Sequence, residues 1–163
     1  MSLNQPQTTT WGPALWFILH VAAEKAGRNP IAVLQVDEVR ELEMLVRSFP
    51  ITLPCPSCQR HSFEYMQAHP ITWGKLKGPD ATPIIRKWFF DFHNHVNGSK
   101  MGPTPAFIYE DIESKYSPII TISEQTSIVL EELHKAISHN WVKHNSAQLF
   151  KRHLGLLRGF LGI

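Results

Sequence analysis

Apolar residues recur at helical spacing along most of this chain, and the alternation typical of strands is rare. Residues 14–26 are apolar on nearly every side, which indicates a helix that is buried on more than one face. Amphipathic stretches with apolar residues three or four positions apart cover 37–49, 55–68, 84–96, 123–143 and 147–161. Residues 117–123 could be extended, but a single strand would have no partner. The pattern predicts an all-α protein.

Composition narrows the class of protein without naming a function. A chain of 163 residues is long enough for one domain with its own core, and its formal charge of +2 argues against an obligate nucleic-acid binder. Residues 1–10 are polar and read as a flexible leader without a signal peptide. No apolar run reaches the roughly 18 residues of a membrane span. We therefore expect a cytoplasmic protein.

The only two cysteines stand close together in Leu53-Pro54-Cys55-Pro56-Ser57-Cys58. Cysteines three residues apart lie on one turn of a helix, where they can close a disulfide. A helix N-terminus also stabilises a thiolate. The pair indicates redox chemistry or a zinc site, with His61 as a further zinc ligand. Two inert buried thiols are the third alternative.

Two further sets of residues combine aromatic and polar side chains at helical spacing. The first is Trp11-Gly12-Pro13 with Trp16 and His20, and the second runs from Trp88 to Asn97 and includes His93. Such faces suit a flat, partly polar ligand. Taken singly, each set is explained as well by an ordinary aromatic core.

The three sets together, in this order and spacing, resemble the Erv/ALR family of FAD-dependent sulfhydryl oxidases. The matching blocks are Trp-Gly-Pro-x-x-Trp-x-x-x-His, Pro-Cys-x-x-Cys-x-x-x-x-Phe and Trp-x-x-x-x-His-Asn-x-Val-Asn. They extend from about Trp11 to Lys100. The short chain is most similar to the members found in large DNA viruses.

The resemblance implies a four- to five-helix bundle around FAD and assigns roles to individual residues. Cys58 would lie beside the flavin, and Cys55 would exchange with substrate. Residues 11–103 would form the FAD-binding sulfhydryl oxidase core, and 104–163 an additional C-terminal helical extension within the same domain or at a dimer interface. The residues implied in FAD binding are Gly12, Pro13, Trp16, His20, Phe63, Trp88, His93, Asn94, Val96, Asn97 and Lys100.

The function implied by the resemblance is disulfide formation in protein substrates. Electrons would pass through Cys55 and Cys58 to FAD and then to O2, giving H2O2. Most cellular members of the family carry a second, distal cysteine pair, and this chain has none. A protein dithiol would therefore reach Cys55 directly, and a thioredoxin-like viral protein is one such partner. We also expect a homodimer, in the host cytoplasm or in the virion. The alternative function is a zinc-stapled helical interaction module built on Cys55, Cys58 and His61.

Overall fold

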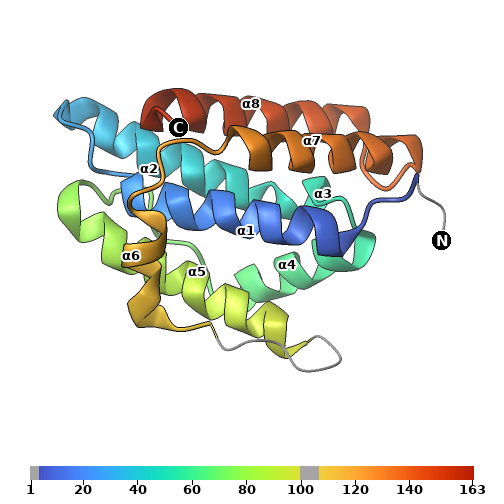
Figure 1. Ribbon diagram of the computed structural model, residues 1–163, viewed down its shortest axis with the longest axis horizontal. Coiled ribbons are helices and arrows are strands. Elements are labelled where there is room, and N and C mark those ends of the chain that lie inside the picture. Colours follow the sequence, from blue (N-terminus) through green and yellow to red (C-terminus); the bar gives the residue numbers. More distant parts are fainter. Residues whose placement is uncertain (1–3, 100–106) are drawn as a thin grey trace.

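The computed structural model describes residues 4–99 and 107–163, and these residues form helices and loops without a strand (Figure 1). The predicted all-α class is confirmed. The α-helices are α1 (Thr8–Lys25), α2 (Ala32–Arg47), α3 (Phe49–Thr52), α4 (Pro56–Ala68), α5 (Ala81–Gly98), α6 (Ile112–Tyr116), α7 (Ser123–Ser138) and α8 (His144–Leu161). Two short 3-10 helices, η1 (Gly78–Asp80) and η2 (Tyr109–Asp111), precede α5 and α6.

Helix α1 runs through the middle of the molecule, which explains its apolar sequence. It packs against α5 on one side and α7 on the other, while α8 lies along α2 (Figure 1). Ile18, Val21 and Ala22 of α1 have no exposed surface. Because these neighbours belong to the same chain, α1 is buried without a second subunit.

The predicted flexible leader over residues 1–10 is wrong in its second half, because α1 already begins at Thr8. Pro6 is buried, and the backbone N–H of Gln7 donates to the carboxylate of Glu132 on α7. This anchor lies 125 residues away in the sequence. A local reading of the polar residues therefore could not find it.

Other helix boundaries also differ from the predicted ones. Helix α2 begins at Ala32, five residues before the predicted start at Asp37. The predicted helix over 123–143 ends at Ser138, because Asn140 takes a left-handed conformation with φ of 57°. Residues 117–122 connect α6 to α7 and join no sheet among the described residues.

Gly27 ends the α1 region at a point where three segments meet. Its φ of +85° favours glycine, and a Cβ there would lie 3.1 Å from Ala81 and 3.3 Å from Val39. Its N–H donates at 2.9 Å to the buried carboxylate of Glu38. This contact fixes the direction in which the chain runs from α1 into α2.

No helix in the described part of the chain is both long and apolar enough to cross a bilayer.

Candidate redox site

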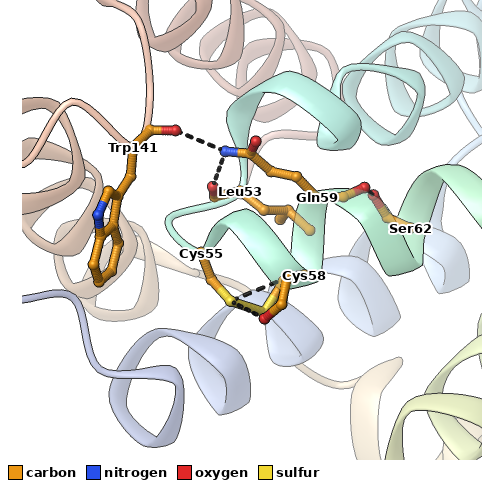
Figure 2. The surroundings of a disulfide bond; sticks show 7 residues. Leu53, Cys55, Cys58, Gln59, Ser62 and Trp141 are labelled. Atoms are coloured by element: carbon orange, nitrogen blue, oxygen red, sulfur yellow. Dashed lines mark hydrogen bonds between the residues drawn. A yellow bond between two sulfur atoms is a disulfide. The ribbon is translucent and has the colours of Figure 1, made fainter.

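Cys55 and Cys58 form a disulfide at the N-terminus of α4 (Figure 2). Cys55 is the N-cap residue in an extended conformation, and Pro56 occupies the first helical position. The two Cα atoms are 5.2 Å apart, a separation typical of disulfides. The proline-flanked motif thus places both sulfurs on the first turn of the helix.

The hydrogen bonds at this turn favour negative charge on Cys55. Its Sγ accepts the backbone N–H of Cys58 at 3.2 Å, and the hydroxyl of Ser57 lies 3.1 Å from it. The helix dipole acts in the same direction. Once the disulfide is reduced, these donors stabilise a thiolate on Cys55.

Cys58 faces a cavity of about 220 Å³ between α1, α4 and α5. The cavity is mainly apolar and aromatic, and Cys55 is not among its lining residues. The lining residues are Thr8, Trp11, Gly12, Leu15, Trp16, Leu19, Phe49, Leu53, Cys58, His61, Phe92, Val96 and Ser99. The two sulfurs therefore have different surroundings.

A second, more open pocket of about 360 Å³ shares Trp16 with the first cavity. It is lined by Pro13, Trp16, Phe17, His93, Phe107, Lys115 and Tyr116. The rings of Trp16 and His93 stack with centroids 4.1 Å apart and planes 5° apart. The stacked pair therefore lies at the boundary between the two pockets, because Trp16 lines both of them and His93 lines the second.

His20 lies directly behind this ring pair and has no exposed surface. Its Nε2 is 3.0 Å from Nδ1 of His93, and its ring stacks on Tyr116 at 4.9 Å. Burial lowers the pKa of His20 to about 3, and the nearby charges of His93 and Lys115 act in the same direction. His20 is therefore neutral at physiological pH.

The structure brings many of the predicted FAD-binding residues together. Gly12 and Val96 line the first cavity, Pro13 and His93 line the second, Trp16 lines both, and His20 contacts His93. Spacing along α1 and α5 places them there, because residues three or four apart share a helix face.

The remaining predicted FAD-binding residues do not line either cavity, or lie outside the residues that the structure describes. Trp88 lines neither cavity; its Nε1 donates to the carbonyl of His69 at 3.2 Å and its ring packs edge-on against Trp73. Phe63 is 51% exposed and lines a separate pocket beside Met66. Asn94 and Asn97 are half-buried on α5 and line neither cavity among the described residues.

Lys100 lies outside the residues that the structure describes.

Several lining residues were not predicted. Leu15 and Leu19 continue the face of Gly12 along α1, so helical spacing could have identified them. Phe107 and Tyr116 reach the second pocket from a segment without any recognised motif. Only the tertiary fold brings these two rings to the pocket that His93 also lines.

The zinc alternative finds no support in this geometry. The sulfurs of Cys55 and Cys58 are bonded to each other. His61 lines the cavity with Cys58, but the described residues contain no group of three or more side chains suited to hold a metal ion.

Comparison with known proteins places this architecture in a family. Residues 13–117 match the Erv1/Alr family. The chain belongs to the Erv1/Alr family. Three viral relatives whose names include the words FAD-linked sulfhydryl oxidase are similar to it.

One relative, from Invertebrate iridescent virus 6, is 33% identical over 93 residues, which cover 53% of this chain and 76% of the relative. A second, from Invertebrate iridescent virus 3, is 36% identical over 90 residues, which cover 53% of each chain. A third, from an African swine fever virus isolate, is 31% identical over 87 residues, which cover 53% of this chain and 65% of the relative. No solved structure matches the chain.

The site fits the FAD that this Erv1/Alr resemblance implies. Within residues 4–99 and 107–163, Nε1 of Trp11 and Nδ1 of His20 are buried without a hydrogen-bond partner. Buried polar atoms usually find partners, so these two atoms, which lie beside the cavities, fit a ligand that carries polar groups. Trp11 lines the cavity beside Cys58, and His20 adjoins the second pocket. Aromatic walls with a few polar atoms suit a dinucleotide that carries two flat ring systems.

Proposed function

We propose that this chain is an FAD-dependent sulfhydryl oxidase that forms disulfide bonds in protein substrates. The observation that carries the proposal is the Cys55–Cys58 disulfide, of which only Cys58 lines the aromatic cavity. The family membership and the names of the viral relatives support it. In this assignment Cys55 meets the substrate and Cys58 faces the flavin.

The thiol chemistry follows from the surroundings of the two sulfurs. A substrate thiolate attacks Sγ of Cys55, the S–S bond breaks, and Cys58 leaves as a thiolate. The second substrate thiolate then attacks the mixed disulfide, which releases oxidised substrate and leaves Cys55 as a thiolate. Ser57 and the N–H of Cys58 stabilise that charge. Two electrons have moved from the substrate dithiol to the cysteine pair.

The residues around the two cavities would hold the cofactor. Gly12, Trp16 and Val96 form walls beside Cys58, while His20 and His93 provide ring faces and nitrogen atoms farther along. When bound, FAD supplies the electron acceptor for the reduced cysteine pair and passes the electrons to O2, giving H2O2.

The test is spectroscopic and kinetic. The purified protein should be yellow, and dithiothreitol should drive oxygen uptake. The variant Cys58→Ala should keep the flavin band and lose oxygen uptake to the uncatalysed background, because the cysteine that faces the flavin is gone. Gln67→Ala, an exposed change near the C-terminal end of α4, is the control and should retain turnover. A colourless protein, or wild-type oxygen uptake from Cys58→Ala, would overturn the proposal.

The proposed function also implies what kind of protein substrate reacts with this chain. Because the chain contains only two cysteines, it has no second pair to relay electrons from a substrate. A protein dithiol, such as that of a thioredoxin-like viral protein, would react at Cys55 directly. A Cys58→Ser variant should retain such a protein as a mixed disulfide, and mass spectrometry after non-reducing electrophoresis would identify it.

We also propose a homodimer that works in the cytoplasm of infected cells or in the virion. Viral relatives and the family resemblance support these assignments. Since α5 and α7 cover α1, a second copy would use another surface, such as that around the exposed Met44 and Ile51. Light scattering gives the mass in solution, and a monomer at micromolar concentration would contradict the dimer.

A further inference from the structure

The side chain of Gln59 joins two segments that lie far apart in the sequence. Its Nε2 donates to the carbonyl oxygen of Leu53 at 2.8 Å and to that of Trp141 at 3.0 Å (Figure 2). A primary amide nitrogen carries two N–H donors, so both are used here. Gln59 thereby ties the segment that enters α4 to the loop between α7 and α8.

The segment around Cys55 depends on such a contact because it is poor in donors. Pro54 and Pro56 have no backbone N–H. The N–H of Cys55 already donates to the carbonyl of Leu53 at 2.7 Å. Residues 54–56 therefore have no further backbone donor with which to bind a neighbouring element. Gln59 supplies that attachment from the adjacent turn of α4.

The loop at the other end of the contact has a defined shape. Asn140 turns the chain through a left-handed conformation, which asparagine tolerates. The N–H groups of Trp141 and Val142 then both donate to the carbonyl of Ala136. These bonds hold the carbonyl of Trp141 toward Gln59, and Figure 2 shows the indole on the side of the turn that carries Cys55.

This contact involves a part of the chain beyond the family match. The match ends at residue 117, whereas Trp141 lies in the C-terminal extension. The extension therefore reaches the redox turn as well as α1 and α2.

We infer that Gln59 is a positioning residue that holds the Cys55–Cys58 turn in the geometry of its disulfide. The loop between α7 and α8 is then a wall of the redox site on the Cys55 side. The functional meaning of this inference rests on the proposed role of Cys55 as the cysteine that meets substrate.

The expected consequence concerns the balance between disulfide and dithiol. The disulfide needs the two Cα atoms near their 5.2 Å separation, whereas the dithiol does not. In a glutathione buffer, the protein disulfide reacts with two molecules of reduced glutathione. The products are the protein dithiol and one molecule of oxidised glutathione. Loss of the Gln59 contacts frees the segment, so the equilibrium constant should shift toward the dithiol by roughly threefold to tenfold.

The experiment compares Gln59→Leu with the wild-type holoprotein in anaerobic glutathione buffers. Acid quenching, alkylation and mass spectrometry give the dithiol fraction. Hydrogen exchange measured on the same samples should show the amides of Trp141 and Val142 exchanging roughly tenfold faster in the variant.

Gln148→Leu is the matched control, because within the described part of the chain the side chain of this exposed glutamine bonds to His144 of the same helix and to no other element. It should change neither measurement. An unchanged glutathione equilibrium in Gln59→Leu overturns the inference, whether or not exchange at the loop increases. Neither readout requires turnover. A wild type without flavin or oxygen uptake would therefore refute the proposed function separately from the positioning role of Gln59.

Discussion

His20 shows how strongly the surroundings of one side chain can set its charge. The rings of His93, Phe107 and Tyr116 are among those that pack against it, and its Nδ1 is one of the orphaned atoms described above. A proton on this imidazole would be buried beside Lys115 with little to balance it. Folding therefore keeps His20 unprotonated over a pH range in which an exposed histidine would titrate.

This charge state predicts a pH dependence of stability. The unfolded chain binds a proton on His20 below about pH 6.5, whereas the folded chain does so only near its pKa of about 3. The stabilisation is therefore complete above pH 6.5 and is lost as the pH falls toward 3, by up to about 1.4 kcal/mol per pH unit. Urea unfolding at pH 7 and pH 5 should show a smaller loss in His20→Phe than in the wild type. Parallel losses would contradict the prediction.

Single residues were predicted with unequal success. The position of Cys58 on the first turn of a helix, within reach of Cys55, could be inferred from its motif, because the prolines and the three-residue spacing favour that arrangement. Phe63 could not be placed in this way. It follows Cys58 by five residues, which turns its side chain away from the face of α4 that carries Cys58, and toward Met66. A motif gives the spacing of residues but not which helix face meets a cavity.

Between elements, Arg86 and Glu24 join α5 to α1 by two hydrogen bonds of 2.6 and 2.7 Å. The Glu24 side chain has no exposed surface, and that of Arg86 is 12% exposed. Hydrogen bonding to Glu24 raises the pKa of Arg86. A neighbouring pair, Lys87 and Asp91, lies on the exposed side of the same helix.

We expect mutation of these two ion pairs to lower the free energy of unfolding by different amounts. Arg86→Met leaves the buried carboxylate of Glu24 without its main partner and should lower the free energy of unfolding by about 3–5 kcal/mol. Lys87→Met removes an exposed pair and should cost less than about 1 kcal/mol. Chemical denaturation of both variants checks the difference. Equal losses would mean that the pair between α1 and α5 is not a structural link.

The existence of the helices was predictable, but their ends were not. Apolar residues at helical spacing identify α1, α2, α4, α5, α7 and α8 because each of these helices buries at least one face. Their boundaries depend on distant partners, such as Glu132 for the start of α1. The positive φ of Asn140, which ends α7, is likewise invisible in a pattern of apolar positions.

At the scale of the whole molecule, the C-terminal extension is built into the same core as the redox site. Helix α7 covers α1, and α8 lies along α2 and also contacts α3. His153 of α8 bonds to Glu41 of α2 at 2.8 Å. The sequence left open whether these residues pack within the chain or between two copies, because an amphipathic helix does not specify its partner.

This arrangement predicts that damage to α8 affects the entire chain. Leu154 is 1% exposed, and Leu154→Ala should lower the free energy of unfolding by about 2–5 kcal/mol. Leu156→Ala, on the same helix at 40% exposure, should change it by about 0.5 kcal/mol or less. Circular dichroism and tryptophan fluorescence should report one shared transition. Two separate transitions would show that the extension folds independently.

The single disulfide also fixes the stoichiometry of any covalent complex. With no cysteine outside the first turn of α4, one chain can attach to one substrate molecule at a time, through one sulfur. A trapped reaction should therefore give one new band on a non-reducing gel, at the summed mass of the two proteins, rather than a ladder. Competing substrates must therefore react at this turn one after another, and the one that is released most slowly limits how often the turn becomes free.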